Sequence, residues 1–215
     1  KAQREAEQAQ RHQQASETAA QLLGKSEPAT AHDYLTHKGI KAHGVRAFGD
    51  RLVIPMRDTA GKLQSLQTIT PDGEKRYHPG GRVKGCYFSI GKPNGKLIVC
   101  EGFATGASIH EATGQAVAVA FDSGNLGAVA QALRDKYPAL EIVLAADDDW
   151  QTTGNLGTTK ATAAAQAVGG LLAVPTFPAG RGDKDTDFND LHRNRGVDAV
   201  RGRIEAAKPM AHGGW

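Results

Sequence analysis

The chain has 215 residues, of which 40% are hydrophobic and 23% charged, a composition typical of one or two globular domains with their own cores. Its two cysteines are too few for a disulfide framework or a zinc ribbon. Every apolar run is shorter than the roughly 18 residues of a membrane helix, and no signal peptide is recognisable. We therefore expect a cytoplasmic protein without a membrane partner.

The net charge of +3 conceals an uneven distribution of charged residues. Between Lys38 and Lys96 there are twelve basic residues and only four acidic ones, so the remainder of the chain is net negative. A basic segment beside an acidic one suggests that one part binds a polyanion and the other binds metal cations. Solvated, lysine-rich hairpins would give the same counts, so charge alone does not decide between these interpretations.

The first half of the chain divides into two segments. Residues 1–28 are rich in Ala, Gln and Glu, which predicts an exposed helix or linker leading in from an upstream domain. In residues 29–95, a helical stretch at 31–39 precedes three apolar runs separated by Gly- and Pro-containing turns. These runs lie at 51–58, 62–70 and 84–91. We predict a small, basic α+β subdomain whose strands are largely antiparallel.

From Lys96 onward, four short apolar runs alternate with helical segments. The runs lie at 97–100, 116–121, 141–146 and 171–174. This alternation is typical of βαβ units, and continuous apolar strands fit a parallel sheet that is covered on both faces. We therefore predict an α/β fold, with an open and mainly parallel sheet flanked by helices, over residues 96–208. Residues 209–215 form a tail.

Acidic side chains follow three of the four predicted strands. Glu101 follows the first strand, the run 147–149 (Asp-Asp-Asp) follows the third, and the acidic segment 183–190 follows the fourth. Ligands of open parallel sheets bind at the carboxyl ends of the strands, so these carboxylates are expected at one edge. In an extended chain, Asp147 and Asp149 would point the same way. Carboxylates are usual ligands of Mg²⁺, and a pair of such ions commonly serves phosphoryl or nucleotidyl transfer.

Each acidic group also has an ordinary structural explanation. Acids that follow strands are often turn residues or helix N-caps, and the segment 183–190 is placed to cap the last helices. Taken alone, Glu101 is better explained as such a turn or cap. The common register of all three groups with successive strands nevertheless favours a shared metal site.

These residues resemble the TOPRIM domain that topoisomerases and bacterial-type primases share. The resemblance rests on Val-Cys-Glu-Gly at 99–102, the Asp-x-Asp at 147–149 and the later acidic motif. The stretch 51–62 is similar to the Arg-x-x-x-Pro-x-x-Asp-x-x-Gly-Arg sequence at the start of the primase polymerase core, and 74–77 continues it. Asp-Phe-Asn-Asp-Leu-His at 187–192 is most similar to plasmid- and phage-borne primases. The resemblance covers roughly residues 30–208.

The resemblance implies the catalytic core of a DNA primase, which synthesises RNA primers from nucleoside triphosphates on a single-stranded DNA template with Mg²⁺ or Mn²⁺. It implies replication of a plasmid, phage or mobile element, and a replicative helicase as a further partner. The catalytic residues that it implies are Glu101, Asp147 and Asp149. It implies a metal site formed by these three together with Asp185, Asp187 and Asp190. The residues that it implies for template or phosphate binding are Arg51, Arg57, Lys62, Lys75, Arg76, Arg82 and Lys84.

Two other functions remain open at this point. A TOPRIM nuclease would use the same metals to cut DNA, and an accessory module of a larger replication or transfer protein would only bind single-stranded DNA. Thr105 favours the accessory module, because replicative primases carry an acid at that position, four residues after the glutamate. A phosphoacceptor receiver domain also places acids at strand ends, but it has no place for the preceding basic β segment.

Overall fold

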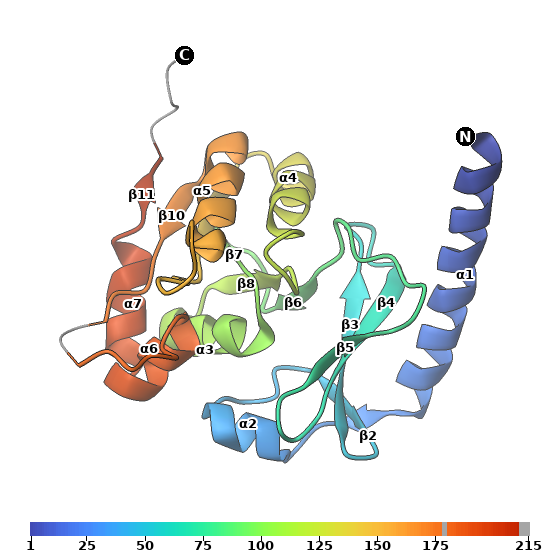
Figure 1. The fold of residues 1–215 in the computed structure, drawn as a ribbon, viewed down its shortest axis with the longest axis horizontal. Helices are drawn as coiled ribbons and strands as arrows, with labels where there is room; N and C mark the ends of the chain where they lie inside the picture. The colour runs from blue at the N-terminus through green and yellow to red at the C-terminus, as the bar shows by residue number, and fades with distance from the viewer. Residues whose placement is uncertain (178–179, 211–215) are drawn as a thin grey trace. The chain divides into compact units, whose positions relative to one another are not determined.

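The protein, described by a computed structural model for residues 1–177 and 180–210, folds into two compact units (Figure 1). The first unit comprises Lys1–Phe88, and the second begins at Ser89. Within the described residues, no helix combines the length and the apolar character needed to cross a membrane. Residues 211–215 of the predicted tail lie outside the described residues.

The first unit contains a five-stranded sheet in the order β1-β2-β3-β4-β5, and every neighbouring pair is antiparallel. Its strands are β1 (Glu27–Pro28), β2 (Arg46–Phe48), β3 (Arg51–Arg57), β4 (Leu63–Ile69) and β5 (Lys75–Tyr77), and the short helix α2 spans Asp33–Lys38. The predicted antiparallel character, the helix and the two long strands are confirmed. The strands β1, β2 and β5 have only two or three residues, too few to show a periodic pattern.

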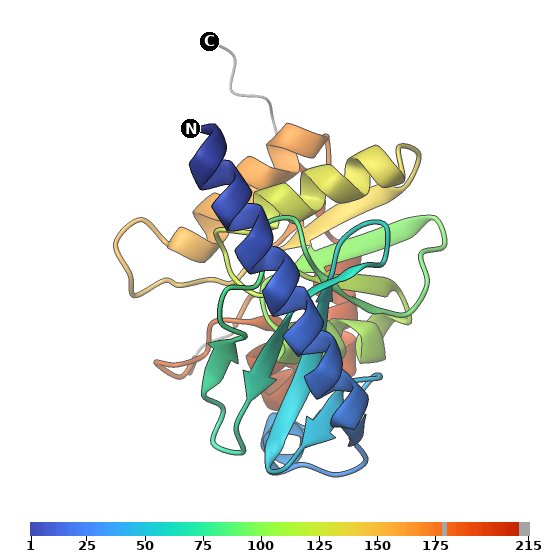
Figure 2. The ribbon, with the colours of Figure 1, turned by 90° about the vertical axis from the view of Figure 1, so that its right-hand side faces the viewer.

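Helix α1 (Ala2–Lys25) is present where a helix was predicted, but it is not an exposed linker. Ala15 and Ala19 are buried, and Ser16 Oγ donates a 2.7 Å hydrogen bond to the carbonyl of Leu63 in β4. Figure 2 shows α1 running across the strands of the five-stranded sheet. The contact uses small side chains, which let the helix approach the sheet closely. The sequence therefore shows no broad apolar stripe along this helix.

The second unit contains a six-stranded sheet in the order β11-β10-β9-β7-β8-β6. Its strands are β6 (Phe88–Ile90), β7 (Lys96–Cys100), β8 (Ala116–Val119), β9 (Glu141–Ala145), β10 (Leu171–Ala173) and β11 (Lys208–Pro209). The four central strands are parallel, as predicted, whereas β11 is antiparallel to β10. The run 84–91 was assigned to the antiparallel subdomain. That assignment was wrong for β6, because β6 lies at the edge of the six-stranded sheet beside β8.

Helices cover both faces of this second sheet. They are α3 (Phe103–Thr113), α4 (Leu126–Lys136), α5 (Leu156–Val168), α6 (Phe188–Arg195) and α7 (Val197–Glu205). Figure 1 shows α4 and α5 on one side of the strands and α3, α6 and α7 on the other. Because both faces are covered, the residues of β8 are all buried, and only the first residue of β7 and of β9 is not. This burial explains the continuous apolar runs.

Candidate active site

The carboxyl ends of β7, β9 and β10 meet at one edge of the six-stranded sheet. Cys100 at the end of β7 pairs with Ala145 of β9, and Ala145 in turn pairs with Ala173 of β10. Glu101 therefore leaves β7 at the same level at which the chain leaves β9 toward the 147–149 loop. Neighbouring strands lie about 4.8 Å apart, so the register brings Glu101 beside the start of this loop.

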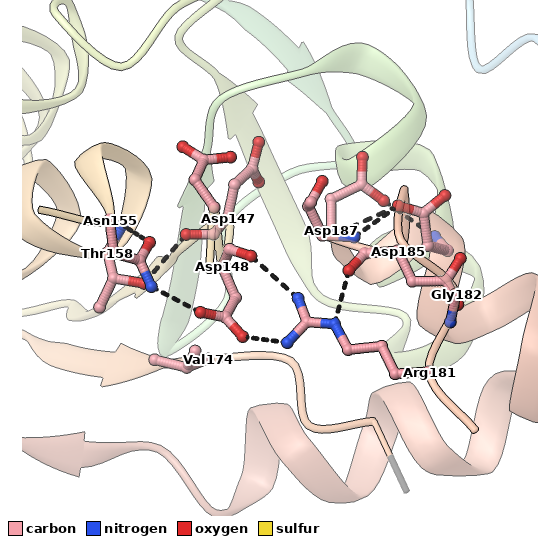
Figure 3. A network of polar contacts seen from close by, with 12 residues as sticks. Asp147, Asp148, Asn155, Thr158, Val174, Arg181, Gly182, Asp185 and Asp187 are labelled. Atoms are coloured by element: carbon pink, nitrogen blue, oxygen red, sulfur yellow. Dashed lines mark hydrogen bonds and ion pairs between the residues drawn. The ribbon is translucent and has the colours of Figure 1, made fainter. Parts of the chain in front are cut away.

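The three aspartates of the 147–149 loop lie beyond the strand, because β9 ends at Ala145. Hydrogen bonds rather than strand pairing hold these residues. Their contacts agree with the expected alternation, because Asp147 Cβ and Asp149 Oδ2 would each lie 3.0 Å from a Cβ at Gly157, whereas the Asp148 carboxylate binds Arg181. Asp148 is the most tightly held. Its Oδ2 accepts a 2.6 Å bond from Arg181, its Oδ1 a 2.6 Å bond from Asn155, and its N–H donates to the carbonyl of Thr186 at 2.7 Å (Figure 3).

Asp147 and Asp149 are attached instead to the first turn of α5. Thr158 Oγ1 donates to the carbonyl oxygen of Asp147 at 3.0 Å, and the N–H of Gly157 donates to Asp149 Oδ2 at 3.0 Å. The N-terminal end of a helix stabilises a nearby carboxylate through its dipole. A Cβ atom at Gly157 would lie 2.6 Å from the carbonyl oxygen of Asp147, so only glycine permits this close approach.

The acids of the segment 183–190 largely organise their own backbone. Asp187 is the N-cap of α6 and accepts a 2.8 Å bond from the N–H of Asp190. Asp190 Oδ2 accepts from the N–H groups of Thr186 and Asp187 at 2.9 and 3.2 Å, which completes a capping box. Asp187 Oδ2 also accepts a 3.0 Å bond from the buried Thr105 Oγ1 of α3.

Asp185 closes the loop that precedes α6. Its Oδ2 accepts from the N–H of Gly182 at 2.9 Å and from the side-chain amide of Asn194 at 2.7 Å. Asp185, Asp187 and Asp190 thus carry the structural roles that their positions near a helix start allow. The structure places Asp187 next to α3, the helix that begins just after Glu101, whereas Asp185 is bound to its own loop.

These acids offer only carboxylate oxygens as metal ligands, and such oxygens suit Mg²⁺ or Mn²⁺ rather than Zn²⁺. Within residues 1–177 and 180–210, no three His, Cys, Asp or Glu side chains converge to hold a metal ion. Mg²⁺ is usually held by one or two carboxylates together with water and substrate phosphates, so a preformed cage is not required. The residues at this edge therefore fit the expected ion.

Arg181, which no sequence pattern indicated as a site residue, binds the loop after β9 to the loop after β10. Its guanidinium group forms the 2.6 Å ion pair with Asp148 and donates to the carbonyl oxygens of Asp148 and Asp185 at 2.9 and 2.7 Å. A lone arginine between Gly180 and Gly182, next to the acidic segment 183–190, was the only available signal. The arginine's partner in the 147–149 loop lies 33 positions away in the sequence.

In the first unit, the predicted basic residues differ in their exposure and in whether they already form an ion pair. Arg82 is only partly exposed and forms a 3.2 Å ion pair with Asp58. Burial alone would raise the pKa of Asp58, but hydrogen bonds from Gln64 and the N–H of Lys62, together with the Arg82 charge, outweigh it. The pKa of Asp58 therefore lies below its ordinary value. Arg82 thus has a structural partner in the β3–β4 hairpin.

The other six predicted basic residues are exposed: Arg51, Arg57, Lys62, Lys75, Arg76 and Lys84. Three of them make local contacts. Arg57 donates to the carbonyl of Gly61 at 3.0 Å, Lys62 reaches the side chain of Gln13 in α1 at 3.3 Å, and Arg76 pairs with Glu74 at 2.8 Å. Such exposed contacts are weak, and a phosphate group can compete with them.

Comparison with known proteins identifies the class of the second unit. Residues 96–198 match the family model described as Toprim domain, so this part of the chain is a Toprim domain. The chain is also 39% identical over 197 residues to DNA primase TraC of Escherichia coli, and 37% identical over 196 residues to another TraC primase of the same organism. Each alignment covers 81% of this chain, but only 19% and 14% of the relatives. The chain therefore spans less than a fifth of the curated relatives that it matches.

Solved structures show the same fold. The primase fragment of the bacteriophage T7 primase-helicase protein superposes with a TM-score of 0.61 at 20% identity, over 85% of this chain and 77% of that one. The DnaG primase catalytic domain bound to single-stranded DNA superposes with a TM-score of 0.63 at 15% identity, over 95% and 81% of the two chains. The predicted fold class and the resemblance to primase catalytic cores are confirmed.

Proposed function

We propose that this chain is the catalytic core of a DNA primase that joins ribonucleotides on a single-stranded DNA template in the cytoplasm, during plasmid, phage or mobile-element replication. The observation that carries the proposal is the shared edge of the Toprim domain, where Glu101 and the 147–149 loop leave register-paired strands. The 37–39% identity to TraC primases supports priming over the nuclease alternative.

The acids at this edge would divide the chemical work among them. Asp147 and Asp149 would bind Mg²⁺ or Mn²⁺, and Asp187 would contribute from the start of α6. A bound ion would stabilise negative charge on the phosphate oxygens of the incoming nucleotide. Glu101 would accept the proton of the primer 3′ hydroxyl as a general base. Asp148 would not take part, because its carboxylate is neutralised by the 2.6 Å ion pair with Arg181, whereas no cation is paired with Asp187 among the ion pairs of the described residues.

The exposed basic residues of the first unit would bind the template backbone or nucleotide phosphates. Arginine can donate two parallel hydrogen bonds to one phosphate, and lysine supplies a compact charge. Arg51, Arg57, Lys62, Lys75, Arg76 and Lys84 are available for this role, and Arg82 would act mainly by supporting the hairpin. Because the solved relatives include a primase-helicase and a single-strand complex, we also propose single-stranded DNA and a replicative helicase as partners.

The Asp147→Asn variant of the full chain tests the proposal in an assay with template, ribonucleotides and Mg²⁺. We expect wild type to lengthen strands and the variant to lose at least about 100-fold in primer synthesis, with unchanged folding and single-strand binding. Asp183→Asn is the matched control, because Asp183 is exposed and belongs to the same acidic region.

Three outcomes would contradict the proposal. Full primer yield from Asp147→Asn would exclude the assigned metal site. Shortened strands in the wild-type reaction would instead indicate a nuclease. Salt-sensitive binding of single-stranded DNA without any synthesis would indicate an accessory module.

A further inference from the structure

We propose that Arg181 is a positioning residue for the metal site, and that it acts through Asp148 to fix the places of Asp147 and Asp149. This inference rests on the proposed function, because it assumes that Asp147 and Asp149 bind the ion. No role in substrate or metal contact is assigned to Arg181 itself. Its hydrogen bonds, its contacts with two aromatic rings and the backbone that it immobilises support this role.

Arg181 joins two loops that are distant in the sequence. Its Nη1 and Nη2 donate to Asp148 Oδ2 at 2.6 Å and to the carbonyl oxygen of Asp148 at 2.9 Å, while its Nε donates to the carbonyl of Asp185 at 2.7 Å. Figure 3 shows this side chain lying between the two loops. One rigid guanidinium group thus fixes the loop after β9 relative to the loop after β10. A lysine ammonium could not reproduce this planar set of donors.

Two aromatic rings restrict the guanidinium group further. The Arg181 Cζ atom lies 4.5 Å from the ring centre of Phe177 and 5.0 Å from that of Trp150, the residue directly after the 147–149 loop. The side chains of Arg181 and Asp148 are each only 19% exposed. Partial burial and stacking strengthen the ion pair and reduce the number of conformations open to the arginine.

Asp148 transmits this restraint to its neighbours. Its N–H, its carbonyl oxygen and both carboxylate oxygens are hydrogen-bonded, so the peptide groups on either side of it are held. Asp147 and Asp149 are the residues joined to those peptide groups, and each has one further bond to α5. If Arg181 is removed, Asp148 is no longer held from the second loop, and the positions of Asp147 and Asp149 are less restricted. Residues that orient metal ligands in this way typically change metal affinity about 10–100-fold when mutated.

The test measures Mn²⁺ binding to the full chain by electron paramagnetic resonance, which does not depend on catalysis. We expect Arg181→Ala to weaken Mn²⁺ binding about 10–100-fold. Arg181→Lys should weaken it nearly as much, because lysine keeps the charge but not the planar set of hydrogen-bond donors. Single-strand binding without metal should stay unchanged. Arg201→Ala is the matched control: Arg201 pairs with Asp198 at 2.7 Å and donates to the carbonyl of Ala112 at 2.8 Å, so its loss should leave Mn²⁺ affinity unchanged.

A double variant tests whether Arg181 acts through Asp148. The fold-losses of Mn²⁺ affinity caused by Arg181→Ala and by Asp148→Ala should not multiply in the double variant, because both substitutions remove the same restraint. Trp150 provides an independent optical signal in a Trp215→Phe background, since the sequence contains only these two tryptophans. Loss of the stacked guanidinium should shift the Trp150 emission in Arg181→Ala, whereas Arg201→Ala should leave the emission unchanged.

The outcomes separate this inference from the proposed function. If wild type and Asp147→Asn bind Mn²⁺ equally, or if neither binds it, the metal site is excluded and the positioning role with it. If Asp147→Asn loses Mn²⁺ while folded Arg181→Ala and Arg181→Lys keep wild-type affinity, only the positioning role is excluded. Fully multiplicative effects in the double variant would exclude the route through Asp148.

Discussion

Replacing Gly157 with alanine should disturb the 147–149 loop more than it disturbs the fold. The added Cβ would lie 2.6 Å from the carbonyl oxygen of Asp147 and 3.0 Å from Asp149 Oδ2. Since carbon and oxygen usually stay about 3.3 Å apart in close contacts, the loop or the start of α5 has to shift by roughly 0.7 Å. Such overpacking costs about 1–3 kcal/mol, offset by about 1 kcal/mol from the better helix propensity of alanine.

Gly202→Ala is the matched control, because Gly202 lies within α7 and a Cβ there has no atom within 4 Å. It should raise the free energy of unfolding by about 0.5–1 kcal/mol, measured by urea denaturation. We expect Gly157→Ala to be about 1–3 kcal/mol less stable than this control and to bind Mn²⁺ about 10–100-fold more weakly. Equal stabilities together with wild-type Mn²⁺ affinity would refute the close-approach argument.

Two further predictions concern the first unit. Ala19→Glu should destabilise it by about 2–3 kcal/mol in urea denaturation, because Ala19 is fully buried. Ala9→Glu, on the exposed side of α1, should have little effect. Equal losses of stability in the two variants would contradict the packing of α1 on the sheet. Because the folded pKa of Asp58 is lowered, its stabilising contribution is complete above about pH 4 and is lost as the pH falls through the folded pKa. The difference in unfolding free energy between wild type and Asp58→Asn should shrink in that range, and a constant difference down to pH 2 would contradict the assignment.

The sequence was sufficient to predict the elements with long, uniform patterns. The apolar runs of β7, β8 and β9 are continuous because both faces of these strands are covered, and this feature identified the parallel sheet. The convergence of Glu101 and the 147–149 loop followed from the rule that parallel strands share one carboxyl edge. The register of β7 with β9 agrees with that rule.

Other features depend on contacts that no local pattern records. The role of α1 was missed because small side chains such as Ala15 and Ala19 mediate its packing, and these residues are equally common on exposed helices. The partner of Asp148 could not be predicted, because Arg181 binds it from a loop 33 positions away in the sequence. Likewise, nothing in the sequence near Asp187 indicates that Thr105 is its partner.

Side-chain bonds between α3 and α6 give the acidic edge a mechanical property. Thr105 binds the N-cap Asp187, and Ser108 of the same helix is hydrogen-bonded to Asn189 at 3.0 Å and to His192 at 3.1 Å. These three side-chain hydrogen bonds join the two helices, which should therefore move together as one rigid unit. Because Asp187 is the N-cap of α6, any tilt of α3 would move this carboxylate, whereas the carbonyl of Glu101 accepts a 2.7 Å bond from the N–H of Phe121 and stays with the sheet. The distance between the two acids therefore depends on how firmly α3 and α6 are held against the sheet.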